Sequence, residues 1–453
     1  MFESRRCPAS MDMIRNHAFT LLAVLMSWQC HASCWAQDAA SSERPTKVSD
    51  SIPNWDDVPG VDSFIHDGEA RRRFQVTGKG LAVVVISTGI NPDHASFSGR
   101  LLKGINLSGE DNNDDTIDRN GSGSHSAGII ARVAPGAKII PIKVFSEHGG
   151  GEWRAIEACL EWVQAQREQI LARHGVRISV VCMPLSDNTN MTAPEMENAS
   201  APARVRIIDL IQKLHSQGIA VCVPAGNAFQ GSEGMGFPAV LPPTISVGAV
   251  NDVDVARAAN NQPILQFASG LKILSLKRGR CSPFSQRLSD ERGGKSRTDV
   301  FAPGISIISA GPYRADDPQA TRTGRSTQTG TSPACSFAAG AILLVQERCR
   351  ILTAGFGKKD WLPTVDFVAE NLHAGGVEFI DEEEEDDGVS NTRQKYRRLD
   401  VVQTMELITK RHQADLSRIR QLLLIEAQKN NNSERPEVLP TPKGGKILEK
   451  TID

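Results

Sequence analysis

The stretch Leu81-Ala82-Val83-Val84-Val85-Ile86 is apolar at every position and ends at Ser87-Thr88-Gly89. A strand that is apolar on both faces, rather than at alternate residues, is typical of a parallel sheet whose two faces are covered. Similar apolar runs follow along the chain, and we predict further strands at residues 139–144, 177–183, 218–223 and 244–250. Residues 81–87 therefore predict a strand of a buried parallel sheet.

Amphipathic segments separate these strands. In residues 152–169 and again in residues 204–216, apolar side chains recur on one helical face. This alternation predicts an α/β fold with a doubly wound, mostly parallel sheet and helices on both faces. Ligands of such sheets bind beyond the carboxyl ends of the strands, which is where Ser87 and Asn227 stand.

The stretch Gly330-Thr331-Ser332 presents a hydroxyl at a tight turn in front of a helix of small residues. Such a serine stands beside the unpaired N–H groups of the first helical turn. Two interpretations are open, because the serine either caps the helix or acts as a nucleophile. A nucleophile needs a base, an orienting carboxylate and a donor for the oxyanion, so the rest of the chain decides between them.

Charge and length narrow the functional classes. The 453 residues include 53 acidic and 51 basic side chains, so the net charge is close to zero. A chain of this kind has no overall field that favours nucleic acid or an anionic membrane surface, and we expect no nucleic-acid partner. The length is ample for one large core or two domains.

The N-terminus has the pattern of an export signal. Arg5, Arg6 and Arg15 precede an apolar run at residues 18–28, and small residues follow around Ala36. We predict a signal peptide at residues 1–36, with Met11 or Met13 as alternative starts, and an exported protein of the periplasm or the extracellular space. The apolar run is too short for a membrane span, so none is expected in the mature form.

The cysteines beyond the leader are widely spaced and form no Cys-x-x-Cys motif, which disfavours a zinc site. Several stand inside apolar runs, as Cys182 and Cys222 do, which favours buried free thiols. One or two disulfides remain an alternative, and the spacing does not indicate which cysteines would pair.

Two segments are rich in acidic residues. Residues 109–123 include carboxylates that are a candidate calcium set, although a solvated loop is favoured there; they are Asp111, Asp114, Asp115 and Asp118. Residues 381–387 are all acidic and predict a second solvated loop. We therefore predict no cofactor, with a structural calcium ion as the open alternative.

With these pieces in place, the chain resembles the subtilases, the subtilisin-like serine peptidases, from about Val76 to Leu407. The resemblance rests on segments in the family's order, namely Val84 to Ile90, Asn120 to Gly128, Pro224-Ala225-Gly226-Asn227 and Gly330-Thr331-Ser332. The implied organisation is a signal peptide (1–36), a linker (37–75), a subtilisin-like peptidase domain (76–412), and a C-terminal helix with a disordered tail (413–453).

The resemblance implies roles for four positions. Ser332 matches the nucleophile and Asn227 matches the oxyanion donor, whereas serines stand at the other two triad positions. Ser87 occupies the aspartate position, and Ser122 occupies the histidine position. A serine hydroxyl accepts no proton near neutral pH and carries no charge, so the triad lacks both its base and its orienting carboxylate.

Other polar residues are weaker candidates for a replacement base. The resemblance implies that His125 and His94 are ordinary structural histidines of the family. Glu110 and Asp118 stand in the loop before Ser122, and neither is expected to serve as the base.

Pro184, in Met183-Pro184-Leu185-Ser186, removes a backbone donor from the segment that lines the substrate in the family.

These residues predict an exported pseudopeptidase that binds a peptide or protein through the cleft of the old active site. The first alternative is an active serine peptidase or esterase with a rewired base. The second is a structural scaffold domain whose cleft is vestigial.

Overall fold

The computed structural model describes residues 47–48, 64–110, 112–187, 189–198, 202–267, 271–354, 361–382 and 391–433. The predicted signal peptide, most of the predicted linker and the predicted disordered tail lie outside these residues. The chain divides into two compact units, Met1–Leu407 and Ile408–Asp453. None of the described helices is long and apolar enough to cross a membrane.

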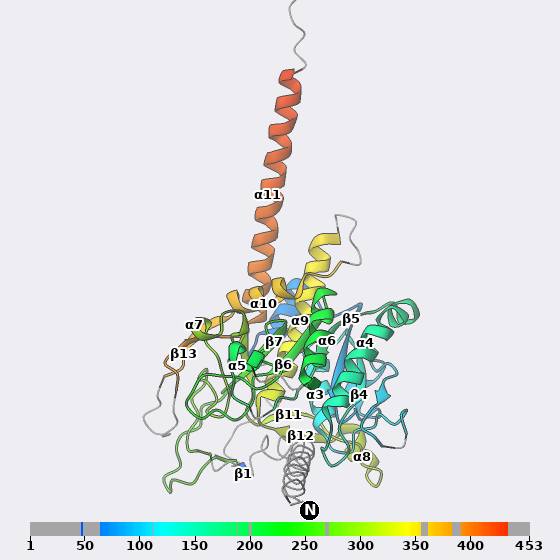
Figure 1. Cartoon of the computed structure of the whole chain (residues 1–453), viewed down its shortest axis with the longest axis vertical. Coiled ribbons are helices and arrows are strands. Elements are labelled where there is room, and N and C mark those ends of the chain that lie inside the picture. The colour runs from blue at the N-terminus through cyan, green and yellow to red at the C-terminus, as the bar shows by residue number, and fades with distance from the viewer. Residues whose placement is uncertain are drawn as a thin grey trace, which may run out of the picture. The chain divides into compact units, whose positions relative to one another are not determined.

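A nine-stranded sheet forms the centre of the first unit, in the order β13-β14-β10-β7-β6-β5-β2-β4-β3 (Figure 1). All neighbours in this sheet run parallel except the edge pair β13 and β14. Its strands are β2 (Leu81–Ser87), β3 (Ile105–Asn106), β4 (Lys138–Lys143), β5 (Arg177–Cys182), β6 (Ala220–Pro224), β7 (Thr244–Val250), β10 (Val300–Pro303), β13 (Val377–Ile380) and β14 (Lys395–Arg398). The predicted α/β fold with a mostly parallel sheet is confirmed.

Two smaller sheets accompany the central one. They consist of β1 (Lys47–Val48), β8 (Leu265–Gln266) and β9 (Lys272–Ile273), and of β11 (Ile307–Ala310) with β12 (Arg325–Gln328). In the second of these, β11 packs against the helix α3 (Ser122–Val133).

Helices cover both faces of the central sheet. Their bounds are α2 (Asp67–Phe74), η2 (Ala95–Phe97), α3 (Ser122–Val133), α4 (Trp153–His174), α5 (Ala193–Asn198), α6 (Pro202–Ser216), α7 (Asp290–Gly293), η3 (Gly294–Ser296), α8 (Pro318–Thr323), α9 (Thr331–Thr353), α10 (Val365–Ala374) and α11 (Val401–Ser433). On one face, α4 packs against β2 and β5, and α6 packs against α4 and β6. Alternate residues of β2, namely Ala82, Val84 and Ile86, belong to the buried apolar cluster on this face. On the other, α3 and α9 pack against each other and against the sheet.

Small residues allow α3 and α9 to approach closely. A Cβ atom added to Gly340 of α9 would lie 2.7 Å from Cβ of Val133 in α3. That separation is far below van der Waals contact, so a larger residue at position 340 would push the two helices apart. Since Ser122 begins α3 and Ser332 lies in the first turn of α9, this contact positions two of the predicted site residues.

Three segments differ from the sequence-based expectations. Helix α2 lies within the predicted linker, and its Arg71 donates hydrogen bonds to the carbonyl oxygens of Arg132 and Val133 at 2.8 and 2.9 Å. The C-terminal helix begins at Val401 rather than near residue 412. Asp381, predicted to lie in a solvated loop, is 5% exposed and pairs with Arg287 at 2.8 Å.

The cysteines of the described residues are all buried and none forms a disulfide; they are Cys159, Cys182, Cys222, Cys281, Cys335 and Cys349. The Sγ atom of Cys335 lies 3.6 Å from that of Cys222 and 4.0 Å from that of Cys182. Burial raises the pKa of the Cys281 thiol to about 12, so this thiol stays protonated near neutral pH. Of the two alternatives left open above, the structure has buried free thiols.

Candidate active site

The segments that carry Ser87 and Ser122 meet at the carboxyl end of β2. The backbone N–H of Gly123 donates to the Thr88 hydroxyl at 3.0 Å. A Cβ atom at Gly123 would lie only 1.8 Å from the carbonyl oxygen of Gly89, so this close approach requires glycine. Two positions that are separated in the sequence are thereby brought together at the carboxyl ends of the strands.

Neither serine at this edge can act as a base. The Ser122 hydroxyl donates to Oδ1 of Asn120 at 2.9 Å. Ser87 is buried at the end of its strand, and its carbonyl oxygen accepts from the backbone N–H of Val144 at 2.9 Å. A hydroxyl group takes up no proton near neutral pH, so these two residues can donate and accept hydrogen bonds but cannot deprotonate a nucleophile.

Asp118 is a buried carboxylate beside these serines. Its Oδ1 accepts from the Thr88 hydroxyl at 2.8 Å and from the backbone N–H groups of Asn120 and Gly121 at 3.0 and 2.7 Å. Its Oδ2 accepts from the backbone N–H of Ser124 at 2.8 Å. Backbone donors at the start of α3 therefore hold both carboxylate oxygens, as in a helix cap. The residue is anchored as a structural anion of this loop.

Glu110, the other acidic candidate, is turned toward a buried lysine. Its Oε2 lies 2.6 Å from Nζ of Lys143, a residue that pairs with Ser87 across β2 and β4. Burial raises the pKa of Glu110, but the hydrogen bond and positive charge of Lys143 outweigh it and bring the pKa below its usual value. A carboxylate with a lowered pKa is a weaker base, so this ion pair disfavours Glu110 in that role.

The two histidines near the site are held by carbonyl oxygens. His125 is fully buried, and its Nε2 donates to the carbonyl oxygen of Ile307 at 2.7 Å. In His94, Nδ1 accepts from the backbone N–H of Ser96 at 3.2 Å while Nε2 donates to Gly324 at 3.0 Å. Burial lowers the pKa of His94, so it is neutral near pH 7. These contacts fit the structural role that the resemblance implies.

Ser332 and Asn227 lie together at the start of α9. Oδ1 of Asn227 accepts from the backbone N–H of Thr331 at 2.8 Å and from its hydroxyl at 3.0 Å. Because Oδ1 faces these donors, the Nδ2 amide group of Asn227 points away from them. This is the orientation that Nδ2 needs in order to donate a hydrogen bond to the oxygen of a ligand. The Ser332 hydroxyl donates to the carbonyl oxygen of Pro184 at 3.0 Å.

The order of these segments, and their position at the carboxyl ends of the strands, agree with the comparisons to known proteins. Residues 78–355, more than half of the chain, match the model of the subtilase family. The chain is a subtilase. The predicted family is thus confirmed.

Among curated subtilases, the chain is similar to Serine protease AprX of Bacillus subtilis (strain 168), with 28% identity over 309 residues that cover 64% of this chain and 62% of the relative. It is also similar to the Intracellular serine protease of Paenibacillus polymyxa, with 26% identity over 60% of this chain and 68% of the relative. The chain therefore spans less than two thirds of the first of these relatives. The solved structure of Sphericase has the same fold, with a TM-score of 0.52, 19% identity, and coverage of 76% of this chain and 99% of that chain.

The segment next to Ser332 in this subtilase uses its backbone donors internally. Leu185 donates its N–H to the carbonyl oxygen of Met183 at 2.7 Å, and Asp187 donates to that of Phe237 at 3.0 Å. Pro184 has no N–H to donate. An extended peptide laid along this segment would find few backbone donors.

The candidate calcium site of the sequence is the acidic segment at residues 109–123. Asp114 pairs with Lys103 at 3.0 Å and Asp115 pairs with Arg119 at 2.9 Å, while Asp118 caps α3 as described above. Asp111 lies outside the described residues. Over the described ranges, no group of three or more His, Cys, Asp or Glu side chains is arranged to hold a metal ion.

The sequence patterns did not indicate the structural roles of two residues that organise this site. Thr331 orients the Asn227 amide, and the only local signal was its place in the first turn of a helix. Asp118 caps α3, and an Asp a few residues before a helix start is the signal that could have identified it.

A buried carboxylate near the carboxyl end of β7 yields a pH-dependent prediction. Asp252 is 8% exposed, and burial raises its pKa to about 7. In the unfolded chain its pKa is about 4. The folded protein therefore holds this proton more tightly, and the contribution of Asp252 to the free energy of unfolding falls as pH rises from about 4 to about 7.

Replacing Asp252 by Asn removes that ionisation. Urea denaturation should show the variant more stable than the wild type at pH 8, by up to about 4 kcal/mol, with the difference near zero at pH 4. The exposed Asp93 provides the matched control, because Asp93→Asn should change stability little at either pH. Equal effects of Asp252→Asn at both pH values would contradict the assignment.

Proposed function

We propose that this subtilase binds a peptide or protein in the cleft at Ser332 and Asn227 without hydrolysing it efficiently. The observation that carries the proposal is the set of groups at the ends of β2 and α3. Serines stand at positions 87 and 122, where the resemblance places the aspartate and the histidine. The adjacent carboxylate of Asp118 is bonded to four donors.

The remaining half of the site supports binding. The Nδ2 group of Asn227 is oriented by Thr331, and the N-terminus of α9 lies beside it. Such donors stabilise a carbonyl oxygen whether or not a reaction follows. A ligand carbonyl held there would replace Pro184 as the acceptor for the Ser332 hydroxyl.

The test is the reactivity of Ser332. The purified protein is exposed to a serine-directed fluorophosphonate probe and to unfolded casein over a wide pH range. We expect no labelling of Ser332 above that of Ser332→Ala and no cleavage of casein. Labelling that disappears in Ser332→Ala would overturn the proposal in favour of an active peptidase or esterase with a rewired base.

A second measurement separates a peptide-binding cleft from a scaffold. Binding of casein-derived peptides is measured for the wild type and for Asn227→Ala. Loss of the Nδ2 donor should weaken binding by about fivefold or more. Absent binding, or binding that the substitution leaves unchanged, would favour the scaffold.

We infer that the protein is exported to the periplasm or the extracellular space. The support is the sequence of residues 1–36, with its basic residues and short apolar run. The test is fractionation of cells that express the full chain with a C-terminal tag, followed by N-terminal sequencing. A new N-terminus near residue 37 in the exported fraction is expected, whereas an uncleaved chain confined to the cytoplasm would contradict the inference.

A further inference from the structure

The backbone next to Asn227 is bonded to two other parts of the chain. The backbone N–H of Gly226 donates to the Thr331 hydroxyl in α9 at 3.3 Å. The carbonyl oxygen of Gly226 accepts from the backbone N–H of Gln286, a residue of the segment before α7, at 2.9 Å. Thr331 also bonds to the side chain of Asn227, so α9 accounts for one of these attachments and Gln286 for the other.

The side chain of Gln286 packs against the same stretch of backbone. A Cβ atom added to Gly226 would lie 1.9 Å from Oε1 of Gln286, so the carboxamide occupies the space where a side chain at position 226 would begin. Gly226 has a φ of +112°, a second reason why glycine is required there. Oε1 of Gln286 also accepts from the backbone N–H of Ala228 at 3.5 Å. One glutamine thus contacts both neighbours of Asn227.

The carboxamide of Gln286 is held at its nitrogen end. Nε2 donates to the carbonyl oxygen of Thr189 and to Oδ1 of Asn190, each at 2.8 Å. Because Nε2 faces two acceptors, the oxygen end must face Gly226 and Ala228. The orientation of the side chain is therefore fixed by the segment that carries Thr189 and Asn190.

Asn227 and Gln286 differ in their access to a ligand. Gln286 is 0% exposed, so it does not form part of the cleft surface. Asn227 is half-buried, and its Nδ2 has no hydrogen-bond partner within the part of the chain that the structure describes. The placement of the Asn227 backbone decides where this free donor meets the oxygen of a ligand, and a small displacement of such a donor weakens its effect strongly.

We propose that Gln286 is the positioning residue for Asn227. It touches no ligand and acts by fixing the backbone on either side of Asn227, so that the Nδ2 donor stands at one place in the cleft. Its effect on ligand binding rests on the function proposed above, whereas its effect on the placement of Asn227 does not.

The first test needs no ligand. The variant Gln286→Met keeps the length of the side chain and removes both amide groups. Magnetic resonance spectra of the protein with isotope-labelled asparagine show the side-chain amide signals, and the signals of Asn227 are those missing in Asn227→Ala. We expect Gln286→Met to shift the Asn227 signals.

Gln346→Met is the matched control. Gln346 is a glutamine of α9 that is 1% exposed, and its Nε2 donates to the carbonyl oxygen of Ser179 at 3.3 Å. Its substitution likewise removes a buried amide group, but it should leave the Asn227 signals in place. Unchanged Asn227 signals in Gln286→Met, or equal shifts in both variants, would overturn the proposal.

The second test measures binding of casein-derived peptides. Gln286→Met should weaken binding by about fivefold, as Asn227→Ala does, and the two substitutions together should weaken it no further, because one acts through the other. Gln346→Met should leave binding unaltered. Losses that multiply in the double variant would overturn the proposal. A wild-type protein that binds no peptide would contradict the proposed function, and the amide signals would still decide the role of Gln286.

A conservative variant supplies a rescue, also if Gln286→Met does not fold. In Gln286→Glu, a protonated carboxyl group can donate to Thr189 and accept from Ala228, whereas a carboxylate cannot donate. Burial raises the pKa of a carboxyl group, so the Asn227 signals should match the wild type at about pH 5 and depart from it at about pH 8. Signals that match the wild type at both pH values would overturn the proposal.

Discussion

The double variant Ser87→Asp, Ser122→His should hydrolyse peptide substrates at least about 10²-fold faster than the wild-type chain. The substitutions put a carboxylate at the end of β2 and an imidazole at the first residue of α3, two segments that already touch through Thr88 and Gly123. The histidine would take the proton of Ser332, and the aspartate would hold the imidazole in the required tautomer. Asn227 needs no change, because Thr331 already orients its amide.

The measurement is the rate of cleavage of a chromogenic peptide, with each single variant and a Ser332→Ala version of the double variant as controls. Ser87→Asp alone should stay near the wild-type rate, whereas Ser122→His alone should recover part of the gain, because a serine–histidine pair without its aspartate retains more activity than a site without the histidine. Adding Ser332→Ala should abolish the gain. A double variant that folds, as judged by circular dichroism, yet gains no activity would show that the cleft has diverged in shape as well as in its triad.

Arg287→Ala should destabilise the protein by about 3–5 kcal/mol. Arg287 is 1% exposed, its Nε lies 2.8 Å from Oδ2 of Asp381, and its guanidinium stacks 3.5 Å from the centroid of the Phe229 ring. Removing it leaves the Asp381 carboxylate buried without its cation, which costs far more than the loss of one contact.

Arg280 is the matched control for this prediction, because its ion pair with Glu382 is partly exposed, at 2.8 Å. Arg280→Ala should cost less than about 1 kcal/mol. Denaturant titration of both variants makes the comparison, and adding Asp381→Asn to Arg287→Ala should recover part of the loss. Equal destabilisation by the two arginine substitutions would contradict the assignment of a buried pair.

The sheet and the long helices could be predicted because their signals are local. Residues 81–87 are apolar at every position up to Ser87, and the structure buries every residue of β2. The strand predicted at 244–250 coincides with β7, and the helix predicted at 152–169 is the core of α4. The short helix α2 has little apolar periodicity and is held by contacts of Arg71 with Arg132 and Val133, so the local pattern does not predict it.

The sequence by itself determined the chemical identity of the site residues. A hydroxyl at positions 87 and 122 cannot act as a base in any fold, and the order of the motifs was sufficient to indicate the subtilase family. The tertiary structure decided which partners the neighbouring carboxylates bond to. Asp118 is bonded to the start of α3, and Glu110 is paired with Lys143.

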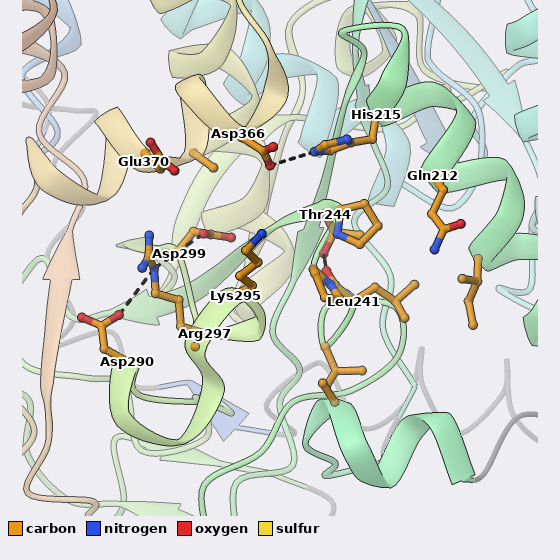
Figure 2. Close-up of a pocket in the computed structure, with 17 residues that line it drawn as sticks. Gln212, His215, Leu241, Thr244, Asp290, Lys295, Arg297, Asp299, Asp366 and Glu370 are labelled. Atoms are coloured by element: carbon orange, nitrogen blue, oxygen red, sulfur yellow. Dashed lines mark hydrogen bonds and ion pairs between the residues drawn. The ribbon is translucent and has the colours of Figure 1, made fainter.

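Long-range packing decided the remaining features. Asp381 belongs to an acidic run, yet it is buried because Arg287, 94 residues away in the chain, lies against it. A cavity of about 760 Å³ is likewise lined by residues of α6, α10 and the segments before β7 and β10 (Figure 2). Such partners are brought together by the crossovers of the sheet, and no local pattern of side chains encodes which distant residues will meet.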